Sequence, residues 1–64
     1  MVKVNGEELA AVGMTVAEYL ASTQYDAKRI AVEVNGDIVP KAKYSETVLQ
    51  DGDRVEIVSF VGGG

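Results

Sequence analysis

Apolar and polar residues alternate in three stretches of this chain, which is the pattern of a β-strand with one buried face. The stretches cover residues 1–4, 30–35 and 54–61. In the last stretch, the alternation places Val55, Ile57 and Ser59 on one face. The opposite face then carries Arg54, Glu56, Val58 and Phe60. We therefore expect three strands, each of which buries every second side chain.

Two Asn-Gly pairs, Asn5-Gly6 and Asn35-Gly36, each follow a predicted strand. This dipeptide is favoured in type I′ turns because both central positions need a positive φ, so each pair predicts a β-hairpin. The return strands are expected at residues 7–12 and 37–39. Pro40 ends the second one, because proline has no amide hydrogen to give to the ladder.

A short helix is predicted after Gly13. Thr15 is a suitable N-cap, and Glu18 three residues later completes a capping box. Met14 and Tyr19 occupy the two positions of a hydrophobic staple around the same cap. One helix face is apolar and consists of Val16, Ala17, Leu20 and Ala21. The polar residues 22–26 end the helix.

The segment between the second hairpin and the last strand gives weaker signals. Residues 41–46 are polar and are predicted to be irregular, residues 47–49 form a short strand or turn, and Asp51-Gly52-Asp53 forms a tight turn. A single helix on one face of a mixed sheet of four to five strands is the economical way to bury the apolar stripes. We therefore predict one α+β domain over residues 1–61.

Composition excludes several classes of function. With no Cys and no His, the chain of 64 residues has no disulfide, no cysteine nucleophile and no Ser-His-Asp triad. Ten acidic and six basic side chains give a formal charge of −4. This charge disfavours nucleic-acid binding and suits docking to a basic partner surface. We expect a protein without enzymatic activity of its own.

The sequence also gives no sign of a membrane partner. Lys3 is followed by Val4, Asn5 and Gly6 rather than by the apolar run of a signal peptide. No stretch approaches the roughly 20 apolar residues that span a bilayer. We therefore expect a cytoplasmic protein.

The chain ends in three consecutive glycines, Gly62, Gly63 and Gly64. Glycine has no side chain to pack and loses the most backbone entropy on ordering, so the run adds nothing to a core. We expect residues 62–64 to form a flexible tail that is thin enough to enter a narrow partner cleft. Its tip offers only the α-carboxylate, which indicates a carrier whose working group is its own C-terminus. The alternative is that these glycines are a disordered end of the chain without a function.

An exposed apolar surface is predicted next to this tail. If Val55 and Ile57 face the helix, Val58 and Phe60 point away from the core and, with Val61, form a candidate partner-binding surface. The alternative is that the twisting end of the strand buries Phe60 against a loop.

Other polar clusters have simpler explanations. Asp51 and Asp53 flank Gly52 as in a calcium loop, but such a loop needs more oxygen ligands at fixed spacing, so a plain turn is favoured. Lys41 and Lys43 are expected in a solvated loop, with contact to an acidic partner as the alternative. We predict no metal site and no bound cofactor.

Together these features resemble the small sulfur-carrier proteins of thiamine biosynthesis, the ThiS family. The resemblance covers the whole chain and rests on Thr15-Val16-Ala17-Glu18-Tyr19-Leu20, Asn35-Gly36-Asp37-Ile38-Val39-Pro40, Leu49-Gln50-Asp51-Gly52-Asp53, Val55-Glu56-Ile57-Val58 and Phe60-Val61-Gly62-Gly63-Gly64. It implies the β-grasp fold that is shared with ubiquitin. Gly63 and Gly64 correspond to the family's essential pair, and Gly62 is an additional glycine.

The resemblance also implies a set of partners. An ATP-dependent, E1-like enzyme would adenylate the Gly64 carboxylate, and a sulfur donor protein would convert it to a thiocarboxylate. A thiazole synthase would then take the sulfur. The ATP is consumed by the activating enzyme, and the carrier itself binds no cofactor.

Three alternatives remain at this point. A carrier for another pathway, such as the molybdopterin synthase small subunit, also ends in Gly-Gly but usually has a longer chain. A ubiquitin-like protein modifier is the second. The third is a β-grasp interaction module whose tail is inert, which would bind its partner equally well without residues 62–64.

Overall fold

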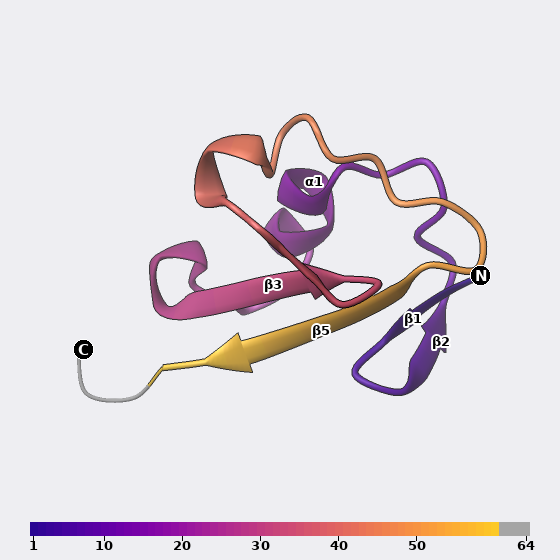
Figure 1. Cartoon of the computed structure of the whole chain (residues 1–64), viewed down its shortest axis with the longest axis horizontal. Coiled ribbons are helices and arrows are strands. Elements are labelled where there is room, and N and C mark those ends of the chain that lie inside the picture. The colour runs from indigo at the N-terminus through magenta and orange to yellow at the C-terminus, as the bar shows by residue number, and fades with distance from the viewer. Residues whose placement is uncertain (61–64) are drawn as a thin grey trace.

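The computed structural model describes residues 1–60. Within them, one mixed sheet of five strands packs against one short α-helix (Figure 1). In chain order the elements are β1 (Val2–Val4), β2 (Glu7–Leu9), α1 (Val16–Ala21), η1 (Ala27–Arg29), β3 (Ile30–Val34), β4 (Asp37–Val39), η2 (Lys41–Lys43) and β5 (Arg54–Ser59), where η denotes a 3₁₀ turn. The predicted α+β class and mixed sheet are confirmed.

The last strand of the chain is the central strand of the sheet, whose order is β2-β1-β5-β3-β4. β5 pairs in parallel with β1 and antiparallel with β3. The two hairpins, β1–β2 and β3–β4, therefore lie on either side of it. This position fixes β5 along both edges.

Both Asn-Gly turns adopt the predicted geometry. Asn5 and Asn35 have φ values of 48° and 54°, and the glycines that follow them have 85° and 87°. Two successive residues with positive φ are the signature of the type I′ turn, whose twist matches that of the strands it joins. The two hairpins are therefore local products of these dipeptides.

The capping box of α1 is also confirmed. The Glu18 amide donates to Thr15 Oγ1 at 3.0 Å, and the Thr15 amide donates to Glu18 Oε1 at 2.9 Å. Met14 and Tyr19, the two staple positions, both pack against the core. These contacts fix where a helix of only six residues begins.

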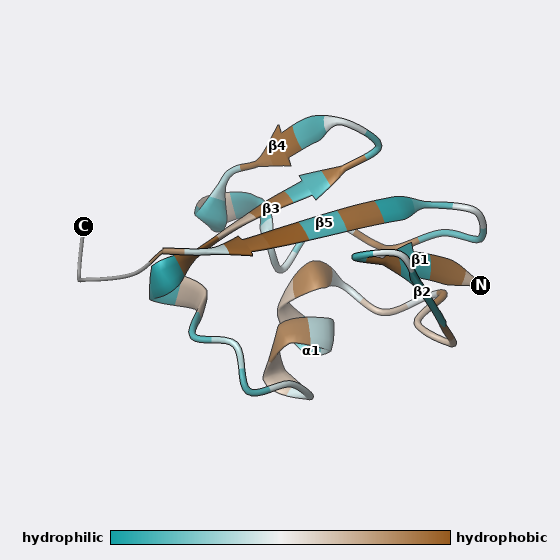
Figure 2. Cartoon of the chain, turned by 90° about the horizontal axis from the view of Figure 1, so that it is seen from below, coloured by the Kyte–Doolittle hydropathy of each residue, from teal (hydrophilic) through white to brown (hydrophobic). Residues whose placement is uncertain are grey.

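α1 covers one face of the sheet and leaves the other open (Figure 2). Val16 and Leu20 of the helix are buried against alternate residues of the strands. Both Val55 and Ile57 of β5 are in this core, as the alternation predicts. Within residues 1–60, the buried apolar residues are Val2, Val4, Ala11, Val16, Leu20, Ile30, Val32, Tyr44, Leu49, Val55 and Ile57.

The return strand predicted at residues 7–12 is wrong beyond Leu9, where β2 ends. Alanine has a low strand propensity, and Gly13 with a φ of 90° turns the chain toward α1. Ala11 is nevertheless buried to 2% exposure, while Val12 points outward. The segment therefore contributes to the core as a loop rather than as a strand.

The prediction of an irregular segment at residues 41–46 is wrong for residues 41–43. Residues 41–43 form the 3₁₀ turn η2, which places Tyr44 in the core. This burial raises the pKa of the Tyr44 phenol. Farther on, Val48 forms a single β-bridge with Thr15, so residues 47–49 contribute a bridge rather than a strand.

Candidate functional site at the end of the central strand

β5 leads directly toward the C-terminal glycines. The predicted strand at residues 54–61 is observed as Arg54–Ser59. The amide of Phe60 donates to the carbonyl of Arg29 at 2.6 Å, which continues the pairing with the β3 side of the sheet by one residue. Val61, Gly62, Gly63 and Gly64 lie outside the described residues, and the prediction of a tail at 62–64 stays a prediction.

Side chains from both hairpin turns hold β5, which sequence reasoning missed. Asn5 Oδ1 accepts from the Ile57 amide at 2.8 Å, and Asn5 Nδ2 donates to the Ile57 carbonyl at 3.2 Å. On the other side, Asn35 Oδ1 accepts from the Arg54 amide at 3.0 Å. Each Asn therefore makes the turn and also binds the neighbouring strand. The turn is visible in the sequence, but the pairing of distant segments is not.

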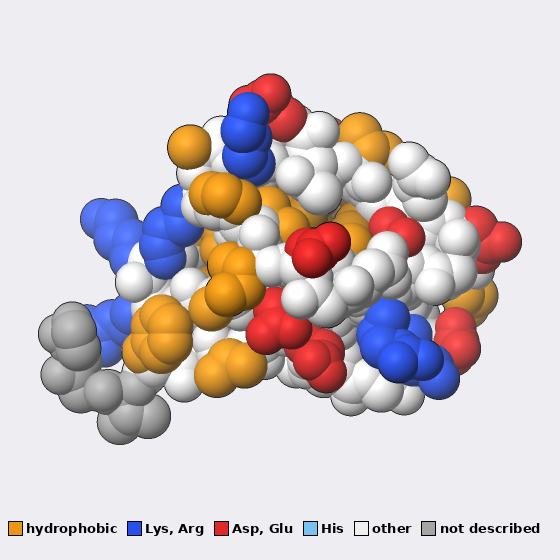
Figure 3. Space-filling view, in the orientation of Figure 1, with side chains coloured by type: hydrophobic (Ala, Val, Ile, Leu, Met, Phe, Trp, Pro, Cys, Tyr) orange, Lys and Arg blue, Asp and Glu red, His pale blue; other side chains and the backbone are white. Residues whose placement is uncertain are grey.

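The outer face of β5 is apolar toward its C-terminal end. Val58 is 54% exposed and Phe60 is 51% exposed. Figure 3 shows hydrophobic side chains gathered on one part of this face of the molecule. The alternative that a loop buries Phe60 is therefore wrong, and the predicted outward orientation of both residues is confirmed.

The neighbours of Val58 leave it uncovered. Its cross-strand partner on β3 is Ala31, whose side chain is too small to shield it. Farther out on the same face, Ile38 of β4 is 70% exposed. The open face thus presents aliphatic side chains from β4 and β5.

Two of the other predicted candidates have structural roles. Lys41 Nζ donates to the carbonyls of Ala27 and Ile30, at 2.8 Å and 3.2 Å, and so joins η2 to the start of β3. Lys41 is exposed, as expected for a solvated segment, and these hydrogen bonds add a structural role that the sequence did not indicate. Lys43 lies 3.9 Å from Glu46 on the surface.

The acidic turn at residues 51–53 is a plain turn, as the sequence favours. Asp53 accepts from the Gln50 amide and from Asn35 Nδ2, at 2.9 Å and 3.0 Å. Asp51 accepts a hydrogen bond from the Met1 amino group, which lowers the pKa of the Asp51 carboxyl. Residues 1–60 contain no group of three or more acidic, His or Cys side chains placed to hold a metal ion.

No helix in the described part of the chain has the length and apolar character needed to cross a membrane.

A mixed sheet folded over one helix, with a central strand that runs toward the C-terminal residues, defines a small β-grasp protein of the ubiquitin-like class.

Within that class, the chain belongs to the ThiS family, whose model matches residues 2–64. The sulfur carrier protein ThiS of Bacillus subtilis is 48% identical over 50 residues, which are 78% of this chain and 76% of that protein. The crystal structure of the thiamine biosynthesis protein ThiS from Geobacter metallireducens superposes with a TM-score of 0.80 at 33% identity. That match covers 98% of this chain and 97% of the other.

A longer protein is similar as well. A thiazole synthase of Paramagnetospirillum magneticum is 45% identical over 62 residues, which are 95% of this chain. The chain spans only 19% of the length of that protein. The similarity therefore concerns one segment of a much larger chain.

Proposed function

We propose that this chain carries sulfur for thiazole formation in thiamine biosynthesis, as a thiocarboxylate on Gly64. The observation that carries the proposal is membership of the ThiS family over residues 2–64, a match that includes the terminal glycines. The same match favours the thiamine pathway over a molybdopterin carrier. The arrangement of β5 supports it, because the central strand is anchored on both edges and runs toward those glycines.

The chemistry requires activation by a partner. A carboxylate is a poor electrophile, because its oxygen is a poor leaving group. In the proposed sequence, the Gly64 carboxylate attacks the α-phosphorus of ATP on an E1-like enzyme and pyrophosphate leaves. Hydrosulfide released from a donor protein then attacks the acyl carbon, the C–S bond forms as the bond from the acyl carbon to the AMP oxygen breaks, and AMP leaves with that oxygen, which splits one difficult substitution into two easier ones. The catalytic groups belong to the partners, and the carrier is not an enzyme.

Glycine suits the acyl position for a physical reason. Without a Cβ at Gly64, the acyl carbon is open to attack from either side, and the backbone of Gly63 can adopt φ values that other residues avoid. Gly62 extends the same unhindered segment. These three residues constitute the sulfur-carrying end in the proposal.

We assign thiazole synthase as the enzyme that receives the sulfur. Proteins named thiazole synthase from Paramagnetospirillum magneticum and Magnetococcus marinus each contain a segment similar to at least 95% of this chain. In those proteins a carrier-like segment and a thiazole synthase share one polypeptide. Such a covalent link raises the effective concentration of the carrier-like segment at the thiazole synthase, which favours binding between the two.

We further assign partner binding to the exposed apolar side chains Val58 and Phe60, together with Val61. Val58 and Phe60 are among the last described residues before the terminal glycines, and both are half-exposed. A partner that covers them would bury apolar area, which favours association.

The experiment that tests the function is reconstituted thiazole formation. The full chain is incubated with the E1-like enzyme, ATP, the sulfur donor and thiazole synthase, and the thiazole product is measured by chromatography. We expect product with the full chain and none with a chain truncated after Val61, which keeps every described element. Equal product from the truncated chain would show that the terminal glycines do not carry the sulfur.

A further inference from the structure

We propose that a small apolar groove beside α1 binds an acidic segment of the sulfur donor protein. In this complex an aliphatic side chain of the donor fills the groove, and carboxylates next to it lie against Lys28 and Lys41. The inference rests on the proposed function, because it assigns a surface of the carrier to one of the partners that this function requires.

The first observation is the groove itself, which has a volume of about 260 Å³. It lies between α1, η1 and the residue that follows η2. Its lining consists of Ala17, Leu20, Ala21, Tyr25, Ala27 and Tyr44. Three of these residues are alanines, whose small side chains leave the space between the surrounding elements unfilled. Because every lining residue is Ala, Leu or Tyr, the hollow suits an apolar group.

Contacts within the fold hold the walls of this groove in place. Leu20 and Tyr44 both belong to the buried core. The Ala17 amide donates to the Tyr44 carbonyl at 2.9 Å, which holds the segment after η2 against α1. The Tyr25 hydroxyl accepts from Asn5 Nδ2 at 3.4 Å. A partner side chain would therefore enter a site that exists before binding, which lowers the entropic cost of association.

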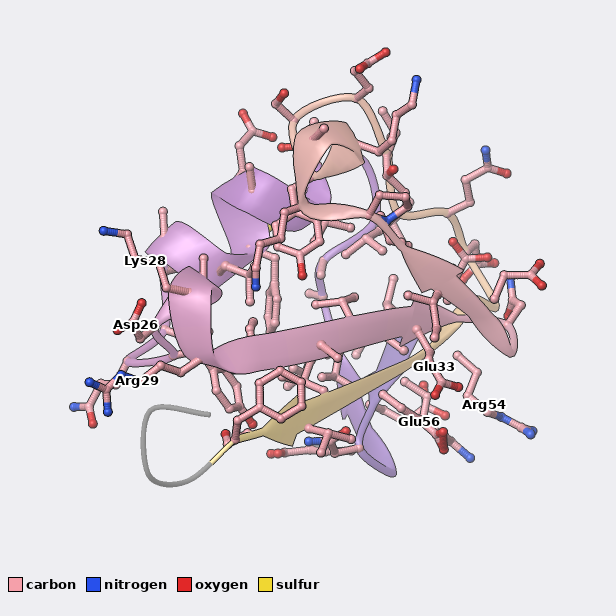
Figure 4. All side chains as sticks on the ribbon, turned by 60° about the vertical axis from the view of Figure 1, so that its left-hand side comes forward. Asp26, Lys28, Arg29, Glu33, Arg54 and Glu56 are labelled. Atoms are coloured by element: carbon pink, nitrogen blue, oxygen red, sulfur yellow. The ribbon has the colours of Figure 1, made fainter. Side chains whose placement is uncertain are left out.

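The second observation is a concentration of positive charge beside the groove. The chain has a formal charge of −4, but four of its six basic residues lie in η1 and η2, namely Lys28, Arg29, Lys41 and Lys43. Figure 4 shows Lys28 and Arg29 at the opposite end of the view from Arg54. An acidic partner is therefore attracted to this end of an otherwise acidic carrier.

Two of these lysines can bind carboxylates of a partner. Lys41 Nζ donates to the carbonyls of Ala27 and Ile30, which leaves one of its three donors for another acceptor. Lys28 follows the groove residue Ala27 in η1. The ion pairs within residues 1–60 are Met1–Asp51, Arg29–Asp26 and Lys43–Glu46, so neither Lys28 nor Lys41 is paired with a carboxylate there. An acidic segment over the groove would gain charge-assisted hydrogen bonds from these lysines.

The size and lining of the groove favour a protein side chain over a small molecule. Pockets for small molecules usually have volumes of about 300–1,000 Å³ and contain a few convergent polar groups. This groove is smaller, and its only side-chain polar groups are the hydroxyls of Tyr25 and Tyr44. An aliphatic side chain that projects from a partner needs no such groups and gains from the burial of apolar area.

The order of the proposed reaction identifies this partner as the sulfur donor. The acyl-adenylate forms in the cleft of the E1-like enzyme, so hydrosulfide must be delivered while that enzyme still holds the carrier. The donor therefore needs a surface other than the one assigned to the enzyme. The groove lies beside α1, whereas Val58 is exposed on the face of the sheet away from α1. The groove is also close to the end of β5, because the Phe60 amide is bonded to Arg29 of η1.

The test uses two variants of the full chain. Ala21→Asp places a carboxylate at an exposed position of the groove, and Lys28→Gln removes a positive charge beside it. Thiocarboxylate formation is followed by mass spectrometry with the E1-like enzyme, ATP and varied concentrations of the donor protein. We expect the donor concentration at half-maximal rate to rise about tenfold for Ala21→Asp and about threefold for Lys28→Gln.

Reactions that need no donor protein serve as controls. ATP–pyrophosphate exchange and thiocarboxylate formation from free sulfide should stay within about twofold of the wild type in both variants, which also shows that the variants are folded. Ala10→Asp is the matched control, because it makes the same change at an exposed alanine beyond β2. It should leave the dependence on donor concentration unchanged.

Each contrary result has a distinct meaning. A wild-type dependence on the donor in either folded variant would overturn the inference. Slower exchange would place the groove in the interface with the E1-like enzyme, and a normal donor step with slower thiazole formation would assign it to thiazole synthase, so both results would also overturn it. Failure of the wild-type chain to form a thiocarboxylate even from free sulfide would overturn the proposed function itself, so the two failures are distinguishable.

Discussion

Val58 and Phe60 stand on the opposite face of β5 from the buried Val55 and Ile57. One alternation therefore produces both the core and the exposed apolar surface. This division was predictable because successive side chains of a strand point to opposite faces. The same alternation predicted that Phe60 is exposed, but it left burial against a loop as an alternative, because a distant loop can reach the end of the strand. In the structure the Phe60 backbone is bound to Arg29, and its side chain is left half-exposed.

At this scale we predict that Phe60→Ala weakens partner binding more than it weakens the fold. The side chain is already 51% exposed, so truncation should lower the free energy of unfolding by about 1 kcal/mol or less. If the aromatic ring anchors the partner, the affinity for the adenylating enzyme should fall on the order of tenfold. Isothermal titration calorimetry and thermal melting measure the two effects separately.

Val12→Ala is the matched control, because Val12 is also 51% exposed but lies in the loop beyond β2. It should leave the affinity unchanged. A Phe60→Ala variant that loses several kcal/mol of stability while the remaining folded protein binds normally would mean that Phe60 serves the fold rather than docking.

At the scale of elements, local signals were reliable and non-local ones were not. The Asn-Gly turns, the capping box at Thr15 and the alternation of β3 and β5 are short-range features, and the structure confirms each of them. The end of β2 at Leu9 and the 3₁₀ turns η1 and η2 were missed, because alanine-rich and three-residue segments have weak periodicity. The contacts of Asn5 and Asn35 with β5 were missed because they join segments that are far apart in sequence.

The contacts of Asn5 lead to a prediction about β5. Asn5→Gly keeps the positive φ that the turn requires, but it removes both side-chain hydrogen bonds to Ile57. The free energy of unfolding should fall by about 1–2 kcal/mol. Because the loss is local, the Ile57 amide should exchange its hydrogen faster in the native state. Urea unfolding and amide exchange by NMR check the two expectations, and an unchanged Ile57 exchange rate would contradict the assigned contact.

At the scale of the whole molecule, one face of the sheet packs against the core and the other is exposed. α1 and the loop residues Ala11, Tyr44 and Leu49 complete a core on one face. The opposite face carries no helix within the described residues and presents charged and aliphatic side chains. The central strand contributes to both faces, with Val55 and Ile57 in the core and Val58 exposed on the open face.

Intact-protein mass spectrometry tests most directly whether Gly64 carries sulfur. The chain is incubated with the E1-like enzyme, ATP and a sulfide source, and a chain truncated after Val61 is treated in parallel. We expect a mass gain equal to one exchange of oxygen for sulfur, located in the C-terminal peptide of the full chain and absent from the truncated one. An unchanged mass, in a reaction where the same enzyme converts another carrier, would contradict the claim.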